Sequence, residues 1–307
     1  MAGSSAMLTF IDTYLSVRRA AGYKLDTAQR YLASYARFAP NETHVRTETV
    51  LHWARQARSE ASRAARLQAL VRFARFAHTE DERNEVPSPD MFRRHRDRRL
   101  PYLYSDAEIK RIVGYAQRLG PLDSLRPHTY STLFGLLAAT GMRISEALSL
   151  RLGDVTPDGL VIRQTKFRKS RLVYLHDSVA NAVARYLAVR ALVADADDHV
   201  FISHRGKHAL HYPIAAETFQ SVLRLAAISA PPGRPRPRLH DLRHTFAVKA
   251  LQASRAARDH ADQHMLALST YLGHAHVADT YWYLDSTPQL MGDIADACDA
   301  FLQGDRS

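Results

Sequence analysis

The sequence predicts a mainly α-helical protein with one small β-hairpin, in which an N-terminal helical bundle precedes an α+β domain. Two observations support this fold class. Apolar residues recur at helical spacing in four segments of the first 80 residues, and two β-prone runs flank a basic turn further along the chain. A proline-containing, charged stretch separates the two regions, so we expect two domains joined by a linker.

The N-terminal domain is expected over residues 1–80. Its helices are indicated by apolar residues at helical spacing, in runs that begin at Leu8, Ala28, Val50 and Leu67. Four such helices with short breaks are typical of a small bundle. Their polar faces are rich in arginine, and the candidate DNA contacts among them are Arg63, Arg66, Arg72 and Arg75. For any single arginine a solvated helix face is the better interpretation, and their clustering favours DNA contact only modestly.

The linker is expected over residues 81–103, because prolines interrupt helices and its many charges resist burial. Ser105 and Glu108 then match the S-x-x-E capping box that begins many helices. The second domain is therefore expected over residues 104–307.

The second domain is expected to be mostly helical with one β element. The runs Leu160–Gln164 and Arg171–Leu175 predict the two strands of a hairpin, whose turn at Thr165–Ser170 is lysine-rich. A short further strand is expected at His199–Ser203. Helices are expected at Asp177–Leu192, Glu217–Ile228, His240–Ser254 and Ala278–Leu284.

The composition restricts the classes of function. The chain has 42 Lys and Arg against 31 Asp and Glu, a net charge of +11, which suits a nucleic-acid partner but also fits an arginine-rich genome. Cys298 is the single cysteine, so an internal disulfide and a cysteine-based zinc site are excluded. We see neither an apolar run of transmembrane length nor a secretory signal. We therefore expect a cytoplasmic protein without a membrane association.

Four short clusters contain residue types that suit phosphate chemistry. Arg143 follows Thr140-Gly141 at a helix start, with Glu146 three residues on, close enough to orient it. Lys166 lies in the hairpin turn beside Arg168 and Lys169. The other two clusters are "HDLRH", which places His240 and Arg243 on one helical face, and "YLGHAHVADTYWYLD", which contains His274, Tyr281 and Tyr283.

Together these clusters resemble the tyrosine recombinase (phage integrase) family, in their order, types and spacing, over roughly residues 105–307. That family has a tyrosine nine residues past the histidine of its "LGH" turn, which selects Tyr283 over Tyr281. Two departures are visible. Thr165 stands where glycine is often found before the lysine, and the interval from Arg243 to His274 is somewhat long. Neither departure changes a chemical group, so an active enzyme is expected.

The resemblance implies a catalytic set of Arg143, Lys166, His240, Arg243, His274 and Tyr283, supported by Glu146. It also implies an N-terminal core-binding domain on DNA. The residue types suit the chemistry: a tyrosine can act as a covalent nucleophile, and two guanidiniums can stabilise the transition-state charge. Histidines can add hydrogen bonds or accept a proton, and Lys166 can protonate the leaving oxygen. No metal and no other cofactor is expected.

Each residue also has a simpler interpretation. The whole role of Arg143 could be to pair with Glu146, and Lys166 could belong to a solvated basic turn. His240 and His244 imitate a zinc-protease helix, but Asp241 and the "LR" that follows do not fit that motif. Two other functions stay open at this point: a type IB topoisomerase with the same catalytic groups, and a DNA-binding regulator that does not catalyse.

The C-terminal tail favours a recombinase over a topoisomerase. Leu290, Ile294 and Phe301 form an apolar stripe at helical spacing, and a tail helix of this kind docks on the neighbouring subunit in the family. The expected partners are double-stranded DNA with paired sites and three further copies of the chain, which is monomeric when free. Accessory DNA-bending proteins or a sister recombinase are further candidate partners. The ending "TYWYLDSTPQLM" resembles recombinases of mobile elements.

Overall fold

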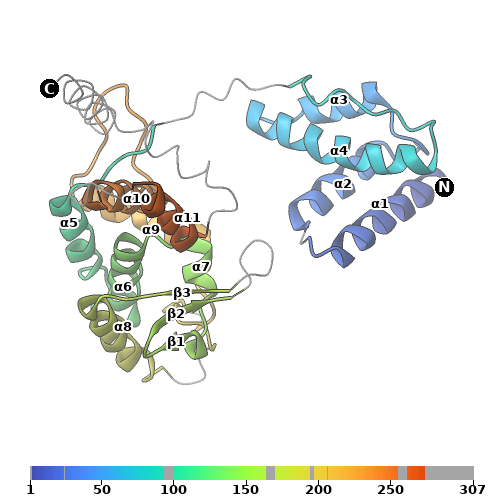
Figure 1. The fold of residues 1–307 in the computed structure, drawn as a ribbon. Coiled ribbons are helices and arrows are strands. Elements are labelled where there is room, and N and C mark those ends of the chain that lie inside the picture. Colours follow the sequence, from blue (N-terminus) through green and yellow to red (C-terminus); the bar gives the residue numbers. More distant parts are fainter. Residues whose placement is uncertain are drawn as a thin grey trace, which may run out of the picture. The chain divides into compact units, whose positions relative to one another are not determined.

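The computed structural model describes residues 2–23, 25–92, 100–163, 170–193, 197–205, 207–254 and 261–273. Within these ranges the side chains of residues 2–6, 254 and 261–264 are not described. The chain divides into two compact units, Met1–Arg98 and Arg99–Ser307, and each is described by itself. The mainly helical fold class with a small antiparallel sheet is confirmed (Figure 1).

The N-terminal unit consists of four helices in its described part. They are α1 (Ala2–Ala20), α2 (Asp26–Phe38), α3 (Thr47–Arg55) and α4 (Glu60–Glu80). Their apolar faces form one core in which Tyr35 and Trp53 meet edge to face, with ring centroids 5.6 Å apart. Because these rings bury large apolar areas, they hold the short helix α3 against α2.

Residues 81–92, at the start of the segment expected as a linker, are tied to this unit. Asn84 is buried, where it accepts a hydrogen bond from the Val45 amide at 2.9 Å and donates one to the Ala77 carbonyl at 3.2 Å. Glu85 accepts a hydrogen bond from the Thr47 amide at 2.8 Å. These side chains satisfy backbone groups that would otherwise be unpaired.

The second unit is organised around the apolar helix α6 (Leu125–Thr140), which packs against α5 (Asp106–Ala116), α8 (Asp177–Arg190) and α10 (Asp241–Ser254) (Figure 1). Phe134 of α6 meets Phe219 of α9 (Tyr212–Leu225) in this core. The remaining described α-helices of this unit are α7 (Ile144–Ser149) and α11 (Ala261–Leu272), of which α11 packs against α10. As the sequence predicts, Ser105 and Glu108 form a capping box at the start of α5.

A three-stranded antiparallel sheet flanks the helices, in the order β1 (Val155–Thr156), β2 (Gly159–Ile162), β3 (Arg171–Val173). The hairpin formed by β2 and β3 is confirmed, with Ile162 opposite Arg171. The two-residue strand β1 was not expected. Residues 199–203 were expected to form a strand but make only isolated bridges, Arg151 to His199 and Ile202 to Ala209.

Several expected elements lie outside the described residues. These are the hairpin turn expected at Thr165–Ser170, of which only Ser170 is described, the helix expected at 278–284 and the C-terminal tail helix. Within the described part of the chain, none of the helices combines the length and the apolar character that a membrane crossing requires.

Candidate active site

Arg143 lies at the start of α7, directly after the end of α6. Gly141 ends α6 with φ 61°, a left-handed conformation that glycine adopts without steric cost. Glu146 accepts hydrogen bonds from the Arg143 amide at 2.9 Å and from Arg143 Nη1 at 3.0 Å. The expected pairing of Glu146 with Arg143 is therefore present. The Arg143 side chain is 36% exposed, which leaves it accessible to a ligand.

Arg243 approaches the same place from α10. It is buried, with Nη1 donating to the Gly141 carbonyl at 2.8 Å and Nη2 donating to the Leu272 carbonyl at 2.9 Å. Arg143 Nη2 donates to the next carbonyl, that of Gly273, at 3.1 Å. The two guanidiniums thus meet at the end of α11, although their residues lie 100 positions apart in the sequence.

His240 occupies the turn before α10, on the same side as Arg243. Its ring packs edge to face on His244, with centroids 4.7 Å apart. His240 as a whole residue is exposed, but its imidazole is partly enclosed by protein. This burial lowers the pKa of His240, and the positive charges of Arg243, Arg238 and Arg143 lower it further. The negative charge of Asp241 opposes the shift. The ring is therefore neutral at pH 7, the form that can accept a proton.

Glu146 has a second partner that sequence reasoning missed. Arg171, the first residue of β3, donates from Nη1 to Glu146 Oε1 at 3.0 Å and from Nη2 to Oε2 at 2.7 Å. Both side chains are almost fully buried, at 13% and 10% exposed. Burial opposes ionisation of Glu146, but the hydrogen bonds from Arg171 and from the Arg143 amide outweigh it and hold the pKa of Glu146 below its usual value.

The strand position of Arg171 explains its burial once the structure is known. Side chains alternate along a strand, so Arg171 lies on the same face as Val173, whose side chain is buried. An arginine at an inward position of a strand requires a buried acceptor. The sequence alone does not single out Arg171, because Leu172 and Tyr174 make the other face of the strand equally apolar.

Several predicted site residues lie outside the described part of the chain. These are Lys166, Arg168, Lys169, His274 and Tyr283. Two described residues are close to them in sequence: Arg171 follows the turn that contains Lys166, and Gly273 directly precedes His274.

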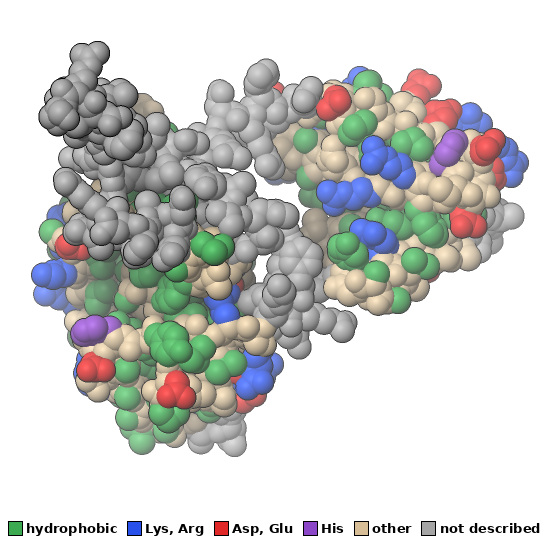
Figure 2. Space-filling model, in the orientation of Figure 1, with side chains coloured by type: hydrophobic (Ala, Val, Ile, Leu, Met, Phe, Trp, Pro, Cys, Tyr) green, Lys and Arg blue, Asp and Glu red, His purple; other side chains and the backbone are tan. Residues whose placement is uncertain are grey.

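The four candidate DNA contacts of α4 fall into two pairs, Arg63 with Arg66 and Arg72 with Arg75. Arg63 and Arg72 are two and a half helical turns apart, so they lie on opposite sides of α4. Arg63 donates to the Ala57 carbonyl at 3.1 Å, and Arg66 donates to the Trp53 carbonyl at 3.0 Å and packs over the Trp53 ring. Arg72 and Arg75 are exposed. Figure 2 shows several Lys and Arg side chains on the visible surface of this unit.

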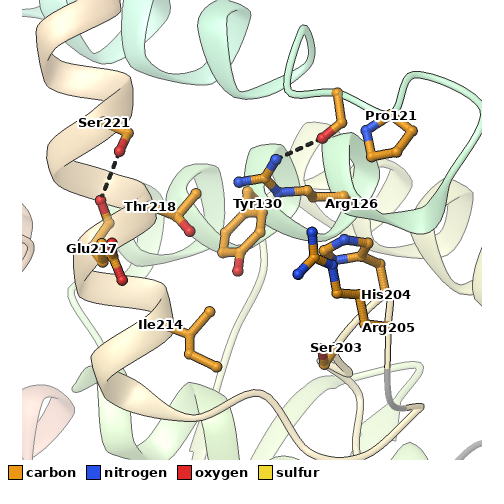
Figure 3. A pocket seen from close by; sticks show the side chains of 11 residues that line it. Pro121, Arg126, Tyr130, Ser203, His204, Arg205, Ile214, Glu217, Thr218 and Ser221 are labelled. Atoms are coloured by element: carbon orange, nitrogen blue, oxygen red, sulfur yellow. Dashed lines mark hydrogen bonds between the residues drawn. The ribbon is translucent and has the colours of Figure 1, made fainter.

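A pocket elsewhere in the second unit involves none of the predicted residues. It lies between α9, the start of α6 and residues 203–205, with Arg126, His204 and Arg205 on one side and Glu217 of α9 on the other (Figure 3). Arg126 donates to the Gly120 carbonyl at 2.6 Å within its wall. We assign the chemistry to the arginine cluster rather than to this pocket.

Gly141 provides a test of the local geometry. A Cβ added there would lie 2.4 Å from the Phe246 ring, and the residue has a positive φ. We expect Gly141→Ala to lower the free energy of unfolding by about 2–4 kcal/mol, from backbone strain and overpacking together. Gly114→Ala is the control, because nothing lies within 4 Å of its Cβ in α5 and alanine should stabilise that helix by about 0.5–1 kcal/mol. Urea denaturation measures both, and equal effects at the two positions would contradict the account.

The family model described as "Phage integrase family" matches residues 103–289. The chain belongs to this family. It is an enzyme of the tyrosine-type site-specific recombinase class.

Two relatives align over almost the whole chain. A protein that bears the name integrase/recombinase y4rB, from Sinorhizobium fredii, is 38% identical over 293 residues, which cover 92% of this chain and 93% of the relative. The tyrosine recombinase XerD of Halalkalibacterium halodurans is 28% identical over 290 residues, which cover 89% of this chain and 91% of the relative.

Solved structures share the fold at lower sequence identity. XerH recombinase bound to difH DNA superposes with a TM-score of 0.64 and 18% identity, over 90% of this chain and 80% of that one. A lambda integrase tetramer bound to a Holliday junction gives a TM-score of 0.60 and 15% identity, over 89% of this chain and 76% of that one.

Proposed function

We propose that this recombinase cleaves and rejoins DNA at specific paired sites through a covalent 3′-phosphotyrosine at Tyr283, on behalf of a mobile genetic element in a bacterial cytoplasm. The observation that carries the proposal is the meeting of Arg143 and Arg243 at the end of α11. Two guanidiniums that lie close together can bind the two nonbridging oxygens of a phosphodiester, which share its negative charge.

The reaction is an exchange of phosphate esters. The Tyr283 oxygen attacks phosphorus and loses its proton to the imidazole of His240 or His274, while the bond from phosphorus to the 5′ oxygen breaks. Lys166 gives a proton to that leaving oxygen. The new phosphotyrosyl ester conserves the energy of the phosphodiester bond that was broken. A 5′-hydroxyl from another strand can therefore reverse the step without ATP.

The arginines stabilise the transition state in different ways. Arg143 is partly exposed and retains N–H groups beyond those bonded to Glu146 and to the end of α11, so it can donate directly to a nonbridging oxygen. Arg243 adds a second positive charge at short range in a buried setting, where such charge acts more strongly than in water.

We propose that exposed basic residues position the DNA through its phosphates. On α4 these are Arg72 and Arg75, because Arg63 and Arg66 have partners within the bundle. Arg168 and Lys169 of the hairpin turn would contact phosphates close to the cleavage point. Their contribution should fall as salt increases, since binding releases counterions.

We propose further that four copies assemble on two DNA sites, because strand exchange needs two duplexes cut in order. The stripe of Leu290, Ile294 and Phe301 would dock on a neighbouring subunit, and head-to-tail docking of this kind can close a ring. The lambda integrase tetramer on a Holliday junction, which shares the fold, supports this arrangement.

The test uses DNA from both ends of the element that carries the gene, in buffer with EDTA and without ATP. We expect a covalent protein–DNA adduct on a nicked substrate and exchange of strands between two sites, because the arginines supply the charge stabilisation. A strict need for Mg²⁺ would contradict the proposal. Relaxation of supercoiled DNA of any sequence by a monomer would instead identify a type IB topoisomerase, and specific binding without an adduct would identify a regulator.

A further inference from the structure

Arg171 contacts two segments that belong to different catalytic motifs. Its guanidinium makes the double hydrogen bond to Glu146, the residue that also binds Arg143. It also lies against the backbone of Gly273, where an added Cβ would be 2.6 Å from Arg171 Nη1. Arg171 itself begins the strand that follows the turn with Lys166.

The contact with Glu146 is of the kind that fixes geometry. A planar guanidinium that forms two parallel bonds to a carboxylate sets both the distance and the orientation of its partner. Glu146 passes this constraint to Arg143, since one of its oxygens accepts from Arg143 Nη1 and the other from the Arg143 amide. The orientation of Arg143 thus depends on a residue of the hairpin.

The contact with Gly273 adds a second constraint. The carbonyl of Gly273 accepts from Arg143 Nη2 at 3.1 Å, and the Arg171 guanidinium occupies the space beside the Gly273 Cα, so both arginines lie next to this residue. His274 is the next residue in the chain. Arg171 therefore lies where the strand after Lys166, the helix start at Arg143 and the chain before His274 meet.

We propose that Arg171 is a positioning residue, which sets Arg143 through Glu146 and ties the hairpin strand to the end of α11. It does not touch the phosphate in this proposal, and it acts on the rate of cleavage rather than on DNA affinity. The inference rests on the proposed function, because it assigns Arg171 a role in the phosphate exchange.

The test measures single-turnover cleavage at saturating DNA together with the Kd for the same DNA. We expect Arg171→Ala to slow cleavage by about 10- to 100-fold, the scale on which small misplacements of reacting groups act, with Kd changed less than about twofold. Arg171→Lys should cleave at an intermediate rate, because its ammonium can keep one of the two bonds to Glu146. Arg171→Lys also tests the proposal if the alanine variant folds poorly.

Two controls separate positioning from general stability. Arg163→Ala removes an exposed arginine, paired with Asp154, from the end of the neighbouring strand, and should leave the rate unchanged. The double variant Arg171→Ala/Glu146→Gln should cleave no more slowly than the slower single variant, since both changes break one link.

The outcomes distinguish this inference from the proposed function. If wild-type protein forms the adduct but Arg171→Ala cleaves at the wild-type rate with only a lower Tm, Arg171 is structural and the inference is wrong. The inference would also be wrong if the rate losses of the two single variants multiplied in the double variant. Absence of any adduct with wild-type protein would contradict the proposed function itself.

Discussion

Tyr283→Phe should abolish the covalent protein–DNA adduct while leaving DNA binding intact. The change removes one phenolic oxygen, the proposed nucleophile, and leaves the ring. The loss should be complete within detection, because no other group supplies the attacking oxygen. Gel electrophoresis under denaturing conditions with labelled, nicked DNA detects the adduct, and a native gel shift measures binding by the same sample.

Tyr281→Phe is the matched control for this experiment. It removes the same atom from a tyrosine two residues away and should retain adduct formation. Adducts that persist in Tyr283→Phe, or that disappear only in Tyr281→Phe, would show that the nine-residue spacing from His274 selected the wrong tyrosine.

Arg243→Ala should lower the rate of cleavage by about 10³-fold or more. The loss of a single preorganised donor commonly costs 10²- to 10³-fold, and here a full buried charge is lost as well. The variant also leaves the Gly141 and Leu272 carbonyls without their donor, at a cost of about 1–3 kcal/mol each in folding stability. Rates are therefore to be measured on samples whose folded fraction has been established by circular dichroism.

Arg190→Ala separates the catalytic effect from the structural one. Arg190 of α8 is also buried and also donates to backbone carbonyls, those of His199 and Val200. Its loss should reduce the free energy of unfolding to a comparable extent while the cleavage rate of the folded protein is retained. Equal losses of rate in the two variants would mean that Arg243 acts only through stability.

The four helices of the N-terminal unit follow from local patterns in the sequence, whereas α6 and α11 of the second unit were not predicted from it. The helices of the bundle have enough length and apolar periodicity to be predicted, and the capping box at Ser105 marks the start of α5. Short β elements are different. β1 has only two residues, and residues 199–203 pair through isolated bridges, so both depend on tertiary contacts rather than on local preference.

The contacts of the candidate site also differ in whether local sequence rules predict them. The pairing of Glu146 with Arg143 is a contact between residues three apart, which helical geometry alone predicts. The approach of Arg243 to the carbonyls of Gly141 and Leu272 joins three distant segments, and no local rule gives such a meeting point. The link from Arg171 to Glu146 was not predicted either, because both faces of the strand that begins at Arg171 are apolar in the sequence and the residues lie 25 positions apart.

The central claim is that the chain joins itself to DNA through Tyr283, and peptide mapping of the adduct tests it most directly. The adduct formed in EDTA is digested with protease and nuclease, and mass spectrometry identifies the residue that carries the nucleotide. The account predicts a 3′-phosphoryl nucleotide on Tyr283. A nucleotide on any other residue, or a linkage through the 5′ phosphate, would contradict it.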